Sequence, residues 1–519
     1  MSSTRTLAKA AGFLMAANFV SRILGFLRET LIAGLFGQSG VTDAYNTAFI
    51  LPDLLYSLLV GGVLSSAFIP VISEYIAKNK EDEGWRVVSS VINITFLALS
   101  FLIIIALIFT PQFVHLLVPG FKANMDLAVH LMRIILIQPL ILAMSGLTMG
   151  ILNSYKIFWP SAVGTVLYNA CIIFFGPLLA HRLGIGGFAV GVVIGALMNF
   201  LVQVPALKKV GFRYYSVIDW QHPSVRRIAT LALPIILSFA LNQIQVIVDS
   251  NLGSSLTAGS ITAIWYSRRL SQLPVGIFAI AVAVAVFPTM TEQAALQQWD
   301  KFRLMSSRAI RMVMFITIPI SIGMIVMRFP LIRVLFQHGE FTSESTLTTA
   351  IPLVYFSLGI VAQSVIQILP RMFYALQDTW TPALIGILAM GINLLGALLL
   401  VKPFATGGLA LANMIASFAN MILLLFILRR RMRQIDGKNL LGTFIKTSAI
   451  SVFAGGIIWL WEGWLTKFLG TGTLASMVIL FTGFCLGILL FAGVAGLLRM
   501  DEFLQTIGLL RRKLKHAHN

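Results

Sequence analysis

The sequence is short of charge, of acidic residues above all, and of cysteine. Only 11% of its 519 residues are charged, whereas a soluble domain of average composition carries roughly a quarter. So few charges could not cover the water-exposed surface of a chain this long, which excludes a soluble enzyme and a nucleic-acid-binding protein. The two cysteines, Cys171 and Cys485, both lie inside apolar runs, so a disulfide framework is excluded as well.

Long apolar runs are what the sequence has in excess, with 58% hydrophobic residues and a mean hydropathy of +0.90. The runs are continuous and do not alternate, which predicts helices and not the strands of a barrel. Fourteen of them reach the length of about 20 residues that a bilayer requires. They cover residues 10–35, 45–76, 87–109, 125–153, 161–180, 186–207, 228–252, 260–295, 306–327, 346–375, 382–401, 407–428, 440–466 and 473–498. The sequence therefore predicts an all-α polytopic membrane protein with 14 transmembrane helices, and Pro274 and Pro288 predict bends in the over-long eighth run.

The loops between the runs differ sharply in positive charge. Lysine and arginine cluster in the second, sixth, eighth and twelfth connections and in the C-terminal tail, whereas residues 36–44 and 253–259 carry none. Cytoplasmic loops hold the excess of positive charge in membrane proteins. This predicts that both termini are cytoplasmic, as an even number of spans requires, and that part of the net charge of +19 faces anionic membrane lipids.

An internal repeat with an offset of 221 residues divides the chain. Gly186-Gly187-Phe188-Ala189-Val190 resembles Gly407-Gly408-Leu409-Ala410-Leu411, and each segment is followed by a basic cluster. Six spans per copy would give two parallel six-helix repeats around a central cavity, which is the geometry of an alternating-access transporter. We predict a first lobe over residues 1–209, a cytoplasmic linker over 210–227, a second lobe over 228–430, and two further helices with a basic tail over 431–519.

Charged residues inside two of the runs indicate what the cavity binds. On the first span Ser21, Arg22, Gly25, Arg28 and Glu29 fall within an arc of roughly 120°, and Arg268 and Arg269 lie in the eighth span, with Asp43 in the first outer loop. Arginine in hydrocarbon is costly, so these side chains must face a polar interior. Guanidinium groups that outnumber carboxylates favour phosphate. The cavity is therefore predicted to be cationic and to bind an anionic, phosphorylated substrate through these residues, and the alternative is a set of structural ion pairs that lock the helices.

A second polar stripe runs along the seventh span, where Ser238, Asn242, Gln245 and Asp249 share one face. A carboxylate among amides suits a Na⁺ site built from oxygen ligands or a proton relay, and Asn393 and Asn413 could supply further oxygens. The alternative is interhelical hydrogen bonding without a bound ion. Beyond this Na⁺ or H⁺ coupling no cofactor is expected, because the chain has no ATP-binding motif.

Several motifs resemble the MurJ (MviN-type) lipid II flippases of the multidrug/oligosaccharidyl-lipid/polysaccharide exporter superfamily. They are the string from Ser21 to Glu29, Thr42-Asp43-Ala44-Tyr45, Leu51-Pro52-Asp53-Leu54-Leu55, Phe68-Ile69-Pro70 and the segment from Phe373 to Pro382. The resemblance runs along essentially the whole chain, including the two extra C-terminal spans.

The resemblance implies a flippase that moves lipid II, the lipid-linked peptidoglycan precursor, to the outer leaflet of the bacterial cytoplasmic membrane. It implies that Arg22, Arg28 and Arg269 contact the pyrophosphate–sugar headgroup with Asp43 nearby, and that spans 13 and 14 form a groove for the polyprenyl tail. Other cell-wall synthesis proteins would be partners. The chain departs from some relatives at Tyr56 and Arg268, which implies that positive charge has moved between the two lobes. Some relatives bind Na⁺ through an Asp of the seventh span and oxygen ligands of the eleventh and twelfth spans, a set with which Asp249, Asn393 and Asn413 are compatible, although Asn413 is a substitution.

Three other classes of membrane protein are alternatives to a lipid II flippase. A membrane glycosyltransferase or polymerase needs paired acid–base groups or a metal site, and the chain has no Asp-x-Asp and no His-Glu-x-x-His motif. A scaffold would not need interior arginines. A flippase for another lipid-linked oligosaccharide or a cation-coupled drug exporter remains the alternative within the superfamily, although a cationic drug would be repelled by this cavity.

Overall fold

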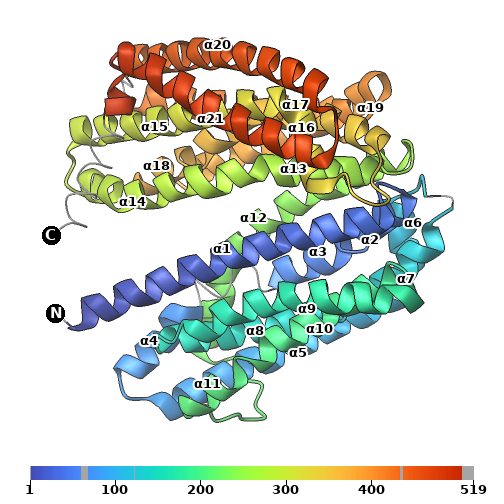
Figure 1. The fold of residues 1–519 in the computed structure, drawn as a ribbon. Coiled ribbons are helices and arrows are strands. Elements are labelled where there is room, and N and C mark those ends of the chain that lie inside the picture. The colour runs from blue at the N-terminus through green and yellow to red at the C-terminus, as the bar shows by residue number, and fades with distance from the viewer. Residues whose placement is uncertain (1, 60–67, 122, 433–435, 505–519) are drawn as a thin grey trace. The chain divides into compact units, whose positions relative to one another are not determined.

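The computed structural model describes all residues except 1, 60–67, 122, 433–435 and 505–519. Within these limits the chain is built from helices and contains no strand (Figure 1). The helices are α1 (Ser2–Phe36), α2 (Gly40–Thr47), α3 (Ile50–Leu59), α4 (Ile69–Ala77), α5 (Glu81–Ile108), α6 (Thr110–Leu117), α7 (Met125–Ile135), α8 (Gln138–Ser154), α9 (Trp159–Leu183), α10 (Gly186–Leu201), α11 (Val204–Lys209), α12 (Pro223–Ser254), α13 (Ser260–Pro274), α14 (Ile280–Ala295), α15 (Trp299–Val326), α16 (Arg328–Phe336), α17 (Ser343–Ile366), α18 (Leu369–Ala375), α19 (Trp380–Met432), α20 (Gly437–Leu469) and α21 (Thr473–Leu497).

The predicted fold class is confirmed. Each predicted apolar run falls on one helix or on consecutive helices, and 10 helices in the described part of the chain are long and apolar enough to cross a membrane. The count of 14 spans stays a prediction. Hydropathy missed the short helices α6 and α16, which lie in connections and are too short to span a bilayer. Residues 60–67 of the second run and the tail cations from Arg511 onward lie outside the described residues.

The eighth run changes its type of helix directly after Pro274, and the bend predicted there stays a prediction. A π-helical turn from Val275 to Ala279 separates α13 from α14 directly after this proline. Proline lacks the N–H that an α-helix requires there, and a π-turn accommodates the mismatch. Pro288, by contrast, lies within the continuous helix α14.

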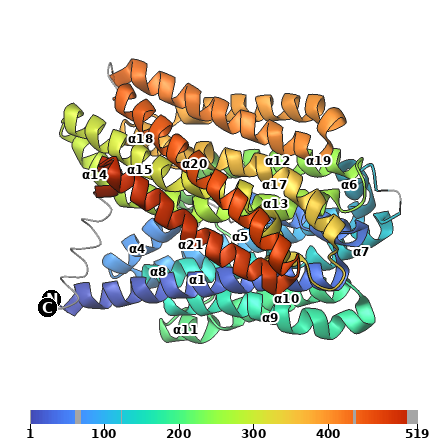
Figure 2. The same ribbon diagram turned by 45° about the horizontal axis from the view of Figure 1, so that its top comes forward.

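The chain divides into two compact units, residues 1–262 with 339–341, and residues 263–338 with 342–519. In the first unit α9 packs along α10 and α1, around a core that includes Val88, Leu131 and Phe188 (Figure 1). In the second, α15 packs against α17 and α20 around a core that includes Phe302, Ile360 and Phe373 (Figure 2). The predicted lobe boundaries come from the sequence repeat, whereas these two units come from contacts in the structure. The division into lobes therefore stays a prediction.

The repeat is visible in the backbone of both units. Equivalent helix ends carry a residue with positive φ, and the pairs are Asn79 (54°) with Gln297 (56°), Lys156 (62°) with Gln377 (59°), and Gly184 (54°) with Ala405 (47°). Ala405 is a helix end because α19 is two helices joined by a kink at this residue. In the last pair ψ is also alike, −140° for Gly184 and −126° for Ala405. Glycine adopts this conformation freely and alanine does not, so the second copy holds a strained residue where the first has glycine.

Glycine is also required where the repeated helices approach each other. A Cβ on Gly187 would lie 2.6 Å from the backbone N of Ala180, and one on Gly408 would overlap the carbonyl of Leu400. These two positions belong to the repeated Gly-Gly motifs. The motifs therefore mark close packing between consecutive spans in each copy.

The two helices beyond the repeat are fixed to the second unit at one end by a buried polar cluster. Helix α20 packs on α15, and α21 packs on α20 and α16 (Figure 2). The Arg311 Nε lies 3.3 Å from the Glu502 Oε1, which also accepts a hydrogen bond of 2.8 Å from the Thr443 hydroxyl. Glu502 is buried, so the segment after α21 is held against both α15 and α20.

Candidate functional site

The residues of the predicted polar arc on α1 differ in their surroundings, because some face α9 and others are exposed. The Ser21 hydroxyl donates a hydrogen bond of 3.1 Å to the carbonyl of Thr165, and the Asn169 amide donates one of 3.1 Å to the Ser21 hydroxyl. Gly25, one turn further, is buried. Ser21 therefore contributes to the packing of α1 on α9, while Arg22 is exposed.

Arg28 forms an ion pair that leaves part of its guanidinium unused. Its Nη2 lies 2.7 Å from the Glu29 Oε1, and the two side chains are only 12% and 4% exposed. The buried Nε of Arg28 has no hydrogen-bond partner among the described residues. A guanidinium has five N–H donors. Glu29 therefore compensates the charge of Arg28 but does not provide an acceptor for every donor of its guanidinium.

Asp43 lies on α2 and holds the beginning of α13. Its Oδ2 accepts a hydrogen bond of 2.6 Å from the backbone N–H of Gly259, and its Oδ1 accepts bonds of 2.7 Å from both the backbone N–H and the hydroxyl of Thr262. Asn46, one turn along α2, donates to the same hydroxyl. The N–H groups of a first helical turn lack partners within the helix, and Asp43 supplies them from a distant part of the chain. We call this contact the Asp43 latch.

The Asp43 latch is shielded from water. Asp43 is 2% exposed and Thr262 fully buried. Burial raises the pKa of the Asp43 carboxyl to about 6, although the hydrogen bonds from Thr262 and Gly259 act in the opposite direction. Above neutral pH the carboxylate is therefore ionised, and all three donors face a negative charge.

The arginines of α13 lie on the face opposite its packing contacts. Tyr266 stacks on Phe336 with ring centroids 4.5 Å apart, and the buried Ser267 hydroxyl donates to the carbonyl of Thr349. These contacts orient the helix so that Arg268 and Arg269 are only half-buried. The Arg268 guanidinium lies 5.4 Å from the ring centre of Phe356, so it is positioned by an aromatic side chain.

A chain of amides continues this face of α13. Gln272 donates to the Gln363 Oε1 at 3.0 Å, and the Gln363 amide donates to the Asn413 Oδ1 at 3.1 Å. The sequence predicted Asn413 as a metal ligand but did not predict this connection. It links Asn413 to the helix that carries Arg268 and Arg269.

The predicted cation ligands are buried, but they belong to different units. Asp249 is 4% exposed in the first unit, and Asn393 and Asn413 are 3% and 8% exposed in the second. The Asn393 Oδ1 has no hydrogen-bond partner within the described residues. Ser238 and Asn242 lie where the side chains are not described. A site formed by Asp249, Asn393 and Asn413 together stays a prediction.

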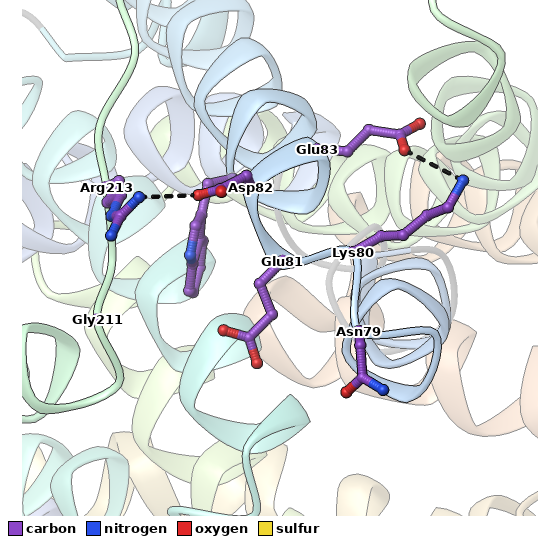
Figure 3. A pocket seen from close by; sticks show the side chains of 8 residues that line it. Asn79, Lys80, Glu81, Asp82, Glu83, Gly211 and Arg213 are labelled. Carbon is purple, nitrogen blue, oxygen red and sulfur yellow. Dashed lines mark hydrogen bonds and ion pairs between the residues drawn. The ribbon is translucent and has the colours of Figure 1, made fainter.

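A pocket of about 540 Å³ in the first unit does not suit a phosphorylated ligand. It lies at the start of α5 and is lined by Glu81, Asp82 and Glu83 (Figure 3). Arg213 pairs with Asp82 at 3.1 Å, and Lys80 lies 3.6 Å from Glu83. Its cations are therefore already neutralised, and none of the arginines of α1 and α13 lines it.

The comparisons with known proteins identify the family. The sequence model of the family described as "Lipid II flippase MurJ" matches residues 32–480. The chain belongs to the MurJ lipid II flippase family. It is 31% identical over 410 residues to the "Probable lipid II flippase MurJ" of Buchnera aphidicola, covering 78% of this chain and 80% of that protein. It is 27% identical to the "Lipid II flippase MurJ" of Burkholderia cenocepacia over 94% and 97% of the two chains.

Solved structures agree with the family. A structure titled "Lipid II flippase MurJ, inward closed conformation" superposes with a TM-score of 0.79 at 27% identity, over 93% of this chain and 99% of that one. A multidrug transporter of the MATE family in an inward-facing conformation shares the fold alone, with a TM-score of 0.66 at 15% identity over 80% and 94% of the two chains. The MurJ family therefore decides between the alternatives: the chain is a transporter embedded in the membrane and not an enzyme, and its function is that of a lipid II flippase and not of a drug exporter.

Proposed function

We propose that this flippase holds the pyrophosphate of lipid II on the arginines of α1 and α13. The observation that carries the proposal is the orientation of α13, whose packing contacts leave Arg268 and Arg269 half-buried on the opposite face. Arg28 adds a guanidinium whose Nε has no partner in the described part of the chain. Paired N–H donors of arginine match two phosphate oxygens at once, which a lysine cannot do.

The remaining predicted residues take supporting roles in this proposal. Glu29 keeps Arg28 in place while the cavity is without substrate, and Ser21 fixes α1 against α9. Arg22, which is exposed on α1, would contact the headgroup directly. Asp43 would act mainly through its latch on α13, because both of its oxygens already accept hydrogen bonds.

The direction of transport follows from the proposed orientation. The positive charge of alternate loops favours cytoplasmic termini in a bacterial inner membrane, so the headgroup would enter from the cytoplasm and leave toward the outer face by alternating access. Enzymes of cell-wall synthesis would supply lipid II on one side and consume it on the other. The tail would follow the groove expected at α20 and α21.

Coupling to Na⁺ or H⁺ is proposed through Asp249, Asn393 and Asn413. The donor set consists of oxygens, which hard cations prefer. The unpartnered Asn393 Oδ1 fits such a role, because a buried amide oxygen without a donor is costly unless something else satisfies it. These residues would hold the cation in one state of the cycle and release it in another.

Substitution of single arginines tests the proposed headgroup contacts. In a strain depleted of its own flippase, Arg22→Ala, Arg28→Ala and Arg269→Ala should each abolish complementation while the protein still inserts. Arginine-to-lysine variants should restore it only in part, because an ammonium keeps the charge but not the two-point contact. Arg182→Ala is the matched control, since Arg182 is exposed at the end of α9. Full activity of Arg22→Ala and Arg28→Ala would return these residues to a structural role.

A further inference from the structure

The connection between α11 and α12 is an extended segment bound to the side of α5. Residues 211–222, which we call the strap, contain no helix. Their backbone is held by three polar side chains of α5. The N–H groups of Tyr215 and Asp219 donate to the hydroxyls of Ser89 (3.0 Å) and Ser90 (2.7 Å), and the Asn93 amide donates to the carbonyls of Tyr215 (3.1 Å) and Val217 (2.9 Å).

One side of the strap faces protein. Phe212 meets Trp85 edge to face at 5.3 Å, and the Arg86 guanidinium lies 5.5 Å from the ring centre of Tyr215. Arg213 reaches back to Asp82 at the pocket shown in Figure 3. These contacts fix which strap side chains point outward.

The strap also exposes four large side chains, of which Tyr214 still donates a hydrogen bond of 2.8 Å from its hydroxyl to the Asn93 Oδ1. Tyr214, Val217, Ile218 and Trp220 are 59%, 39%, 44% and 65% exposed. Water-exposed loops rarely gather four such side chains within seven residues. Tyrosine and tryptophan are the residues that membrane proteins concentrate at the bilayer–water boundary. Because α5 satisfies several of its backbone groups, the strap can lie partly out of water at a low cost.

The strap is bound to α5 close to the point where the apolar, exposed face of this helix begins. Asn93 is followed one turn later by Phe96 and Leu97, which are 44% and 52% exposed and begin the apolar outer face of α5. At 1.5 Å per residue, the strap carbonyls bound to Asn93 lie only about 5 Å from that face. The exposed strap side chains are therefore continuous with the surface that contacts lipid.

The charges beside the strap select the kind of lipid. Lys208 and Lys209 precede it and Arg226 follows it, and none of the three has a carboxylate partner among the residues described. Cations at a membrane surface attract anionic headgroups. We propose that the strap is an interfacial anchor, with Val217, Ile218 and Trp220 inserted among the lipids and Lys208, Lys209 and Arg226 bound to anionic phospholipid. The leaflet concerned is the cytoplasmic one, which rests on the proposed orientation.

The depth of the strap can be measured directly. In the full chain with Cys171→Ser and Cys485→Ser, spin labels are placed at Ile218→Cys and, as a water-exposed control outside the strap, at Asp300→Cys, whose native side chain is 98% exposed. In phospholipid vesicles the label at 218 should collide mainly with oxygen and the label at 300 mainly with a water-soluble nickel complex. Equal access of the nickel complex to both labels would overturn the anchor.

The choice of lipid is tested by the rate of lipid II transport in vesicles with and without phosphatidylglycerol. Each lysine near an anionic membrane surface raises the affinity for that surface about fivefold. The double variant Lys208→Gln/Lys209→Gln should therefore lose most of the stimulation of the transport rate that phosphatidylglycerol gives the wild type. Lys438→Gln, which changes an exposed cation in the first turn of α20, should retain it. Stimulation that is unchanged in the double variant would overturn the anionic-lipid contact even if the depth result holds. An impermeant thiol reagent applied to Asp300→Cys in cells tests the proposed orientation separately.

Discussion

Removal of the Asp43 carboxylate should loosen the beginning of α13 and, through it, the arginines two turns further along. Asp43→Ala deletes the acceptor of three hydrogen bonds of 2.6–2.7 Å from Gly259 and Thr262. Asp43→Asn keeps one oxygen acceptor for Thr262 but turns an NH₂ group toward one of the donors. The two variants therefore remove different amounts of the same contact without adding volume.

The size of each effect follows from burial. A buried donor left without a partner costs about 1–3 kcal/mol, so Asp43→Ala, which leaves three donors, should cost about 3–9 kcal/mol in the free energy of unfolding. Asp43→Asn loses one charged bond and creates one donor–donor contact, which should cost about 2–3 kcal/mol. For a unit of this size the smaller loss lowers the melting temperature by about 5–10 °C.

The assay compares the melting temperature of the purified variants at pH 8, where Asp43 is ionised, with their transport of lipid II in vesicles. Asp126→Asn is the matched control, because Asp126 is an exposed acid in the first turn of α7, and its melting temperature should stay close to that of the wild type. Thr262→Val removes the bond from the hydroxyl to Asp43 and the bond that the hydroxyl accepts from Asn46, and it keeps the backbone bond. Its loss of stability should be less than additive with that of Asp43→Ala, because the two changes share one hydrogen bond.

Two results would refute the latch. If Asp43→Asn melts with the wild type and changes only the KM for lipid II, Asp43 contacts the substrate and does not position α13. If Thr262→Val and Asp43→Ala are fully additive, the hydrogen bond between them does not contribute to stability. A fall in melting temperature together with a fall in kcat supports the latch.

Two further predictions concern the turn of the second repeat and the coupling site. Ala405→Gly should raise stability by about 1 kcal/mol, because it relieves strain at φ 47° and ψ −126° at a smaller cost in chain entropy. The reciprocal Gly184→Ala should lower the melting temperature, and an unchanged value in both variants would exclude the strain. Asp249→Asn keeps its size but not its charge, so it should retain expression and substrate binding and lose turnover or its dependence on the ion. Activity that rises with Na⁺ at fixed pH would indicate a Na⁺ site, a response to pH alone would indicate a proton relay, and wild-type rates under every gradient would leave Asp249 as a structural hydrogen-bonding group.

The helical fold could be predicted from the sequence because hydropathy reports directly on burial in a bilayer. The same reasoning missed α6 and α16, whose eight and nine residues are too short to give a spanning signal. The polar arc of α1 was predicted as one surface. In the structure Ser21 bonds to Thr165 on α9 while Arg22 is exposed, because a helix that packs on one neighbour divides any wide arc into a contact edge and an open edge.

The partners of Asp43 could not be predicted, because they lie 216 and 219 residues away in the chain. A signal was nevertheless present. Thr42-Asp43-Ala44-Tyr45 aligns with Thr262-Ala263-Ile264-Trp265 at an offset of 220 residues, close to that of the repeat. Asp43 therefore binds the segment that corresponds to its own in the second copy. At the place that matches Asp43, the second copy has Ala263.

That substitution makes the contact one-sided. Ala263 has no acceptor with which to hold the first turn of α2, which instead is closed locally by Ser39 and Thr42. Helix α2 therefore keeps its own cap when the Asp43 latch is broken, whereas α13 loses partners for the N–H groups of Gly259 and Thr262. Loss of the latch also leaves the buried carboxylate of Asp43 on α2 without its three donors, and a buried charge without partners is costly. The contact therefore stabilises both helices, and α13 is the helix whose Arg268 and Arg269 are proposed to hold the headgroup. A headgroup that stabilises these arginines would offset part of the cost of losing the latch.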